Sequence, residues 1–555
     1  MSSEENAKNA DLEAFSDGGL RQGGSSTYSS GVDNRGAPDL DVDAEQGPLQ
    51  QVQVPEQGPL GEIESDFVQK YGPVKCVFFD KPPEHPILTR PHALNYFFKG
   101  VLHRSKGERG SGQFELFIDL LYVGIVANLA ATATEEHNGL SLLRYVLTFL
   151  PAWQVWSDLR DFMNYYYNND LTQKALVLWI LALLVVYANN ASKVAMSSAE
   201  TALVVGPYVL ARFTMATVAF LYTFVIHQHR RQMRFYAIST YCTCALWLAV
   251  IWINVRAKVA VAFICLALEI GSYAITFHPW FKKLVRAKYS TAVNIEHEVE
   301  RVSAFFIIAL GESLLGIVQS SPAPNGFTLN LARAIMTLII SYCFLWLYFN
   351  GEGSEKAVHA LRRSVTSAFL WVYVHIPIMG GLILASEAAV EMTASNVDTT
   401  KKHPHTESSE SESAGHHVAE AAAKFVVNTL SKAAEHSSEG GEEEVETHYS
   451  LQFFFTGGLC VSLLGITIMA LADKSMDPKG HKLVPPIIRL VPRAAIAIII
   501  LCLAFAEMQT TLLLGITALL LVLLVGFETV AMMPRDRAPM FTDGPPHPPI
   551  PDHYL

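Results

Sequence analysis

Ionisable side chains interrupt several long apolar runs of this sequence. Glu115 and Asp119 lie four residues apart, so in a helix about 40° of rotation separates them and both carboxylates share one face. A charge at the centre of a membrane-spanning helix costs roughly 2.5–3.5 kcal/mol, so it should face a cavity or a partner. Such carboxylates could pass protons or cations through a membrane. Both lie near the start of their run, however, and could instead reach headgroup water or pair with Arg109.

Arg301 and Glu312 place opposite charges on one stripe of a second run. Eleven residues separate them, which leaves about 20° of rotation and about 16 Å along a helix, too far for a direct pair. Glu312 is the carboxylate that we most expect near the middle of the membrane. Its neighbours Gly311 and Ser313 are small and allow another helix to approach. The alternative is a structural salt bridge between Glu312 and an arginine such as Arg212.

Three further ionisable residues lie within apolar runs: Arg212, Glu269 and His375. His375 stands between Tyr373 and Pro377, and the proline would free a backbone carbonyl and could open a polar break. Because histidine changes charge near neutral pH, His375 is the natural proton-handling candidate. A hydrogen-bonded core histidine explains the same position equally well.

Composition excludes several classes of protein. The chain has 555 residues, of which 50% are hydrophobic and 17% charged, and its mean hydropathy is +0.25, unlike a disordered chain or an ordinary soluble enzyme. The net charge of −11 comes largely from a polar tail and one acidic loop, and the chain lacks the basic footprint of a nucleic-acid-binding protein. The sequence contains no nucleophile with a base, phosphate loop, HExxH or paired CxxC motif. We therefore expect no enzyme, cofactor or metal site.

Apolar runs of about 18 to 25 residues are long enough to cross a bilayer, and each should be a helix because backbone groups in lipid must pair internally. We predict an all-α, polytopic membrane protein with about twelve spans. Only Glu507 separates the last two spans, so they could form one hairpin and the count could be off by one. The spans are placed at 114–132, 141–162, 172–189, 202–226, 235–255, 258–278, 296–318, 331–349, 364–387, 450–472, 486–506 and 508–532.

The regions outside the spans differ in composition. Residues 1–65 are expected to be a disordered polar tail, residues 66–112 an ordered collar near the membrane, and residues 535–555 a Pro-rich tail. The loop 388–449 is acidic, and we expect it to be a solvated loop with one amphipathic helix at 418–434. A loose metal or proton buffer is the alternative for this loop, built from His403, His405, His416 and His417.

Lysine and arginine in the connections set the expected orientation. With a cytoplasmic N-terminus, the five short inner loops hold fifteen of these residues and the short outer loops hold three, Lys193, Arg256 and Lys258. We therefore expect both termini in the cytoplasm, and the protein in the plasma membrane or an endomembrane.

Two segments indicate an internal repeat. Residues 166–175 (YYNNDLTQKA) and 348–357 (YFNGEGSEKA) share four identical and four similar residues of ten, at an offset of 182. This favours a parallel duplication of six spans, 113–290 and 291–534, related by an axis along the membrane normal. The rival interpretation is two aromatic interface belts, each followed by a polar loop.

At its motifs the sequence resembles the low-temperature-requirement A (LtrA) family of bacteria and fungi, in its fungal type. The resemblance rests on FELFIDL at 114–120, on His297 and Glu300-Arg301 followed by LGES at 310–313, and on WLYF at 346–349 and YVHIP at 373–377. It implies an integral membrane protein with many helices and a link to growth and stress in the cold, but no substrate. The chain departs from the family pattern at three positions, Ile118 and Val302 where Phe is usual and Asn350 where Asp is usual, and the last puts a charge-based role of that position in doubt.

The leading hypothesis is a transporter coupled to protons or cations, with its pathway between the two halves. Glu115, Asp119, Arg301, Glu312 and His375 would line this pathway. Its expected partners are the lipid bilayer and a small ion or proton. A different class explains the same charges as a closed salt-bridge network in a non-transporting sensor or scaffold, and a cation channel is a third option.

Overall fold

The computed structural model describes residues 76–81, 83–106, 112–136, 138–194, 197–319, 326–351, 353–354, 357–394, 443–477, 481–506 and 508–535. Helices dominate these residues, and each predicted span falls on one long helix. The long helices are α2 (Gln113–Glu136), α3 (Gly139–Tyr166), α4 (Leu171–Asn190), α5 (Ser198–Val225), α6 (Arg230–Ala249), α7 (Val255–Phe277), α9 (Ile295–Gln319), α10 (Leu329–Asn350), α12 (Val365–Ala394), α14 (Glu443–Ala472), α15 (Pro486–Leu503) and α16 (Thr510–Ala531).

Ten helices in the described part of the chain are long and apolar enough to cross a membrane. The two long helices outside that group are more polar, since α3 contains Asp158, Arg160 and Asp161 and α6 begins with Arg230 and Arg231. The structure is therefore that of a helical, polytopic membrane protein, and the exact number of spans stays a prediction.

Polar caps explain where many helices begin. Asn138 and Ser141 form a reciprocal capping box at the start of α3, and the side chain of Asp170 accepts the Gln173 amide at the start of α4. Ser197, Asn254 and Thr328 cap α5, α7 and α10 in the same way. The short capped connections reverse the chain, so successive helices run in opposite directions.

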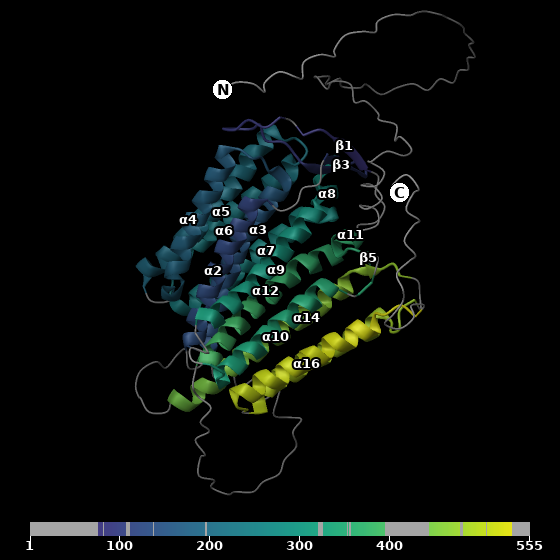
Figure 1. Cartoon of the computed structure of the whole chain (residues 1–555). Coiled ribbons are helices and arrows are strands. Elements are labelled where there is room, and N and C mark those ends of the chain that lie inside the picture. Colours follow the sequence, from purple (N-terminus) through teal and green to yellow (C-terminus); the bar gives the residue numbers. More distant parts are fainter. Residues whose placement is uncertain are drawn as a thin grey trace, which may run out of the picture. The chain divides into compact units, whose positions relative to one another are not determined.

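The first six long helices, called the first helix group below, meet the last six, called the second helix group, at α2, α9 and α12. Figure 1 shows α4, α5 and α6 on one side of the bundle and α10 and α16 on the other, with α9 and α12 between them. α2 packs against both α9 and α12, and α12 packs along α14. The contact of α2 with α9 is called the seam below.

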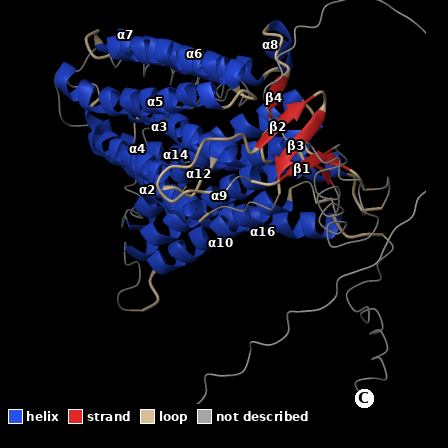
Figure 2. Ribbon diagram, turned by 90° about the horizontal axis from the view of Figure 1, so that it is seen from above, coloured by secondary structure: helices blue, strands red, loops and turns tan. Residues whose placement is uncertain are grey.

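The prediction of an all-α chain omitted two small sheets at the end of the bundle where α2 begins, called the sheet end below. The larger sheet has the order β1-β3-β2-β4, and Figure 2 shows its strands side by side. Lys99 and Gly100 have positive φ angles (49° and 81°) and make the tight turn between β2 and β3. The strands are β1 (Cys76–Phe79), β2 (Asn95–Phe98), β3 (Val101–Ser105) and β4 (Tyr289–Thr291) in the larger sheet, and β5 (Ala357–Val358) and β6 (Lys474–Ser475) in the smaller.

The larger sheet joins the collar to the link between the two helix groups. β4 follows α7 and the short helix α8 (Pro279–Leu284), directly before α9, and it pairs with β2 of the collar. Nearby, Arg104 of β3 bonds Glu296 at the start of α9. Strands of two to five residues have no detectable period in the sequence, which explains why they were not predicted.

Two predictions fall on the boundaries of the described residues. α12 continues to Ala394 and α14 starts at Glu443, so both ends of the predicted loop 388–449 are helical. The predicted helix at 418–434 and the four loop histidines lie outside the described residues, as do the predicted tail at 1–65 and all but the first residue of the predicted tail at 535–555.

Candidate functional site

Three buried arginines each contact two carboxylates, and together they form a charge network in the first helix group and across the seam. The exposed fraction of each arginine side chain is 2% or less. The three triads are Arg301 with Asp119 and Glu115, Arg160 with Asp161 and Glu298, and Arg212 with Asp158 and Glu269.

The Arg301 triad lies at the seam. Arg301 of α9 places Nη2 2.6 Å from Asp119 Oδ1 and Nη1 3.8 Å from Glu115 Oε2. His297, one turn earlier on α9, has its Nε2 2.9 Å from Glu115 Oε2. Trp156 of α3 donates its indole N–H to Asp119 Oδ1 at 2.8 Å. The two carboxylates therefore share one face of α2, and that face is fully buried against α9.

The Arg160 triad joins α3 to the start of α9. Arg160 Nε is 2.9 Å from Glu298 Oε1, and its Nη2 is 2.9 Å from Asp161 Oδ1. Asn164, one turn further along α3, donates to Glu298 Oε2 at 3.3 Å and to the Asn294 carbonyl at 3.0 Å. Glu298 thus receives donors from two turns of α3.

The Arg212 triad joins α3, α5 and α7. Arg212 Nη1 bonds Asp158, and its Nε is 3.8 Å from Glu269 Oε1. Tyr236 of α6 also donates to Asp158. Tyr208 donates to Glu269 at 2.8 Å and Trp247 does so at 3.2 Å; these complete the hydrogen bonds of this carboxylate.

Counting charges shows what the network can do. Among the ion pairs of the described residues, six carboxylates face three guanidinium groups, and His297 joins them as a group that can gain a proton. Charges taken out of water must be compensated, because the desolvation cost exceeds several kcal/mol per ion. With every carboxylate ionised, the network carries three excess negative charges, or two when His297 is protonated. Protons bound to some of the carboxylates would remove such an excess of charge.

The predicted site residues divide between these triads and two separate places. Glu115, Asp119 and Arg301 meet at the seam, and Arg212 and Glu269 share the third triad. Glu312 belongs to no triad and is only partly buried, in the last third of α9. Its alternative partner Arg212 pairs with other carboxylates.

Glu312 instead lies within electrostatic range of a second acid, Glu387 of α12. Beside them, Ser313 donates a hydrogen bond to Ser386. Ser313 thus brings α9 and α12 together, as predicted, whereas Gly311 is exposed and a Cβ atom there would meet nothing within 4 Å. Within the described residues no ion pair links Glu312 to the seam.

His375 has the geometry of a core histidine. Its Nδ1 lies 2.6 Å from the Trp371 carbonyl oxygen, to which it donates, and the Tyr348 hydroxyl donates to Nε2 at 3.1 Å. α12 continues through Pro377 as one helix, so the polar break suggested by the proline does not form.

Sequence reasoning missed part of the network. Asp158, Arg160 and Asp161 were not selected as site residues, although three charges within four positions of a predicted span were a usable signal. Glu298 was missed because it lies at the helix start, where carboxylates are common on solvated surfaces.

The second helix group has its own buried pair. Arg493 of α15 donates to both oxygens of Glu528 on α16, at 2.5 and 2.6 Å, and to the Gly351 carbonyl at 2.9 Å. Asn350 donates to Glu528 at 3.3 Å. An aspartate at position 350 would repel Glu528, whereas the amide of Asn350 donates to it.

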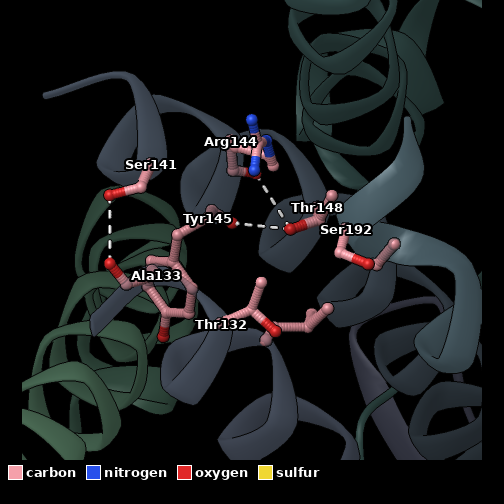
Figure 3. Close-up of a pocket in the computed structure, with 9 residues that line it drawn as sticks. Thr132, Ala133, Ser141, Arg144, Tyr145, Thr148 and Ser192 are labelled. Carbon is pink, nitrogen blue, oxygen red and sulfur yellow. Dashed lines mark hydrogen bonds between the residues drawn. The ribbon is translucent and has the colours of Figure 1, made fainter. Parts of the chain in front are cut away.

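One pocket lies at the end of the bundle opposite the sheets, between α2, α3 and the turn after α4 (Figure 3). Its volume is about 10 Å³, which is the least that holds one water molecule. Ser141 and Thr148 donate to backbone carbonyls, and Arg144 pairs with Glu136. These polar groups are thus already bonded within the protein and offer a ligand little to bind.

Comparisons with known proteins agree with the motifs at the seam. Residues 111–527 match the family described as bacterial low temperature requirement A protein (LtrA). An uncharacterized protein of Rhizobium meliloti (strain 1021) is 23% identical over 300 residues, which cover 52% of this chain and 69% of that protein. No solved structure matches. Since the family match spans more than half of the chain, this protein belongs to the LtrA family.

Proposed function

We propose that this protein is a membrane transporter coupled to protons or cations, and that its two helix groups move against each other at the seam. The carrying observation is the pairing of Glu115 with His297 and of Asp119 with Arg301, each across 182 residues. This is the offset between the two similar decapeptides, and α2 and α9 also begin 182 residues apart. In a parallel duplication, residues that contact their own equivalents lie on the axis between the repeats.

Ion pairs at this axis give protons a way to control the contact between the halves. A proton on Glu115 or Asp119 removes a negative charge that holds His297 or Arg301. The seam then loses part of its attraction, so proton binding favours a state in which the halves separate. The side chains of both pairs are at most 1% exposed, as expected for the state in which the two halves are in contact.

The proposed orientation of the protein in the membrane rests on its basic loops. The basic loops assigned to the cytoplasm connect helices at the sheet end, so this end would face the cytoplasm. The membrane would be the plasma membrane or an endomembrane. The fungal type and the link to cold and stress stay predictions.

A flux assay in vesicles tests this function. The full chain is reconstituted with a pH-sensitive dye inside, and a pH gradient is imposed. We expect proton-coupled flux from the unchanged protein and a loss of about tenfold or more in Glu115→Gln and Asp119→Asn, which keep shape but remove charge. Glu391→Gln, an exposed carboxylate of α12, is the matched control and should leave flux intact.

The outcomes separate the proposal from its rivals. No flux from folded, unchanged protein, or equal flux from the seam variants, contradicts it. Glu312→Gln asks separately whether the partly buried acid of α9 belongs to the pathway; unchanged flux would remove Glu312 from it.

A non-transporting sensor or scaffold is the second candidate. It is favoured by one observation, namely that each buried arginine of the network already has two carboxylate partners in a closed interior. It predicts no flux, together with protein binding by the N-terminal region. A cation channel would differ from both by currents far above the turnover of a carrier.

A further inference from the structure

The connection between α7 and β4 carries the short helix α8, which lies beside β4 at the margin of the bundle (Figure 2). Only His278 separates α8 from α7, a helix long and apolar enough to cross the membrane, and its side chain caps the start of α8. Pro279 follows, and it cannot continue α7 because it has no backbone N–H. α8 therefore begins where a membrane span ends, at the level of the membrane surface.

The apolar side chains of α8 point in two directions. Trp280 and Leu284 lie four residues apart and so share one face, and they are 59% and 62% exposed. Phe281 is 5% exposed, and its ring lies 4.5 Å from the ring of Phe235 on α6. Phe281 thus anchors α8 to the bundle, while the other two apolar side chains face outward. Tryptophan is enriched at the boundary between lipid and water, where such a pair can enter the membrane.

The same connection is strongly basic. Residues 278–294 contain four lysines or arginines and no acidic residue. Lys283, Arg286 and Lys288 are exposed, and the side chains of the two lysines form no ion pair within the described part of the chain. The outward face of α8 and these three cations, called the α8 surface below, consist of Trp280, Leu284, Lys283, Arg286 and Lys288.

Neighbouring segments add positive charge to the α8 surface. Arg231 of α6 donates to the Arg286 carbonyl at 2.5 Å, and β2 pairs with β4. The segments around these contacts, 227–235 and 95–106, each contain three lysines or arginines and no acidic residue. The first acid after α8, Glu296, is already bonded to Arg104. The chain itself therefore brings little negative charge to this surface.

We propose that the α8 surface binds the headgroups of anionic phospholipids. Exposed cations beside a membrane span attract an anionic lipid surface, and outward apolar side chains add contact with the acyl region. The position of α8 directly after a span puts both groups at the depth where headgroups lie. Binding of lipid here needs no transport, so it goes beyond the proposed function and can be measured without flux.

Thermal unfolding of the full chain in mixed micelles tests the proposal. The midpoint is recorded with phosphatidylserine and with phosphatidylcholine at the same mole fraction, and also with inorganic phosphate. A ligand that binds only the folded state raises its stability. We expect the midpoint in phosphatidylserine to exceed that in phosphatidylcholine by about 2 °C or more. Sodium chloride at about 1 M should remove most of this difference, because it screens exposed charges.

Two pairs of matched variants tie the difference to the α8 surface. Lys283→Gln with Lys288→Gln removes two exposed cations, and Lys193→Gln with Arg256→Gln removes two exposed cations from the connections expected on the other side of the membrane. Trp280→Ala and Trp252→Ala each remove one exposed indole. The changes at the α8 surface should at least halve the lipid-dependent difference, and their counterparts should preserve it. All these side chains are exposed, so the variants should fold.

Several results overturn the proposal. They are equal midpoints in the two lipids, a difference that resists salt, and equal losses in the α8 variants and their counterparts. A rise of the same size with inorganic phosphate overturns it as well, since a free anion would then be the ligand and not a lipid.

Discussion

Arg301 and Asp119 lie 182 residues apart in the chain, and their side chains meet at 2.6 Å with no solvent exposure on either. The pair joins α2 to α9, the first helix of each group. Glu115 and His297 repeat the same relationship one turn earlier. Two successive turns of α2 and α9 thus hold the halves together through ionisable groups. Apolar side chains at these positions would form a contact that protons could not affect.

Replacing Arg301 should lower the free energy of unfolding much more than replacing a surface arginine. Arg301→Met leaves Asp119 and Glu115 buried without their guanidinium, which typically costs about 3–5 kcal/mol. The double variant Arg301→Met with Asp119→Asn should recover part of this loss, because the remaining amide is neutral and can still accept from Trp156. Thermal unfolding in detergent measures both.

Arg144→Met is the matched control for Arg301, because its pair with Glu136 is partly exposed and should be worth about 0–1 kcal/mol. Equal losses for the two arginine variants would contradict the view that Arg301 holds buried charge.

Neutralising one carboxylate of the Arg160 triad should leave the protein at least as stable as before. Asp161→Asn removes one excess negative charge, and Arg160 keeps Glu298 as its partner at 2.9 Å. We therefore expect the thermal unfolding midpoint of this variant to equal or exceed that of the unchanged protein. A large drop would mean that the triad is balanced as it stands.

The helices could be predicted from sequence because each leaves a local mark. Apolar runs placed the twelve long helices, with ends that differ from the structure by at most seven residues, and the four-residue spacing of Glu115 and Asp119 put them on one face. These features depend on neighbours in the chain, so one sequence is enough.

Charge partners could not be predicted, because they depend on which helices pack together. Arg212 meets Asp158 at a separation of 54 residues, and nothing in either segment identifies the other. For His375 the sequence suggested a function that the contacts do not support. Its position in the sequence suits a proton carrier, but its hydrogen bonds with Trp371 and Tyr348 are those of a core histidine.

The close crossing of α12 and α14 should depend on one of two adjacent glycines. A Cβ atom on Gly458 would lie 2.4 Å from the carbonyl oxygen of Gly381, whereas a Cβ on Gly457 would meet nothing within 4 Å. Gly458→Ala should therefore separate the helices and destabilise the protein by about 1–3 kcal/mol. Gly457→Ala is the matched control. Equal unfolding midpoints for the two variants would show that the crossing is looser than the structure indicates.

Stability should fall in acid because of His229, which links the sheet to the helices. Its Nδ1 lies 2.9 Å from the Tyr166 hydroxyl, and its Nε2 lies 3.2 Å from the Asn95 carbonyl oxygen. Burial lowers the pKa of His229 to about 4, from an ordinary value of 6.5. The unfolded chain therefore takes up a proton at higher pH than the folded one. The contribution of His229 to stability is complete above pH 6.5 and is lost as the pH falls to about 4.

The variant His229→Gln removes this titration and should flatten the decline of the unfolding midpoint between pH 6.5 and 4.5. Some decline should remain, because burial also lowers the pKa of His359 to about 4. The exposed neighbour His227 provides the control, and His227→Gln should keep the full decline. If His229→Gln and the unchanged protein lose stability in parallel as the pH falls, the protonation of His229 does not drive acid unfolding, and the sheet contact is held by other groups.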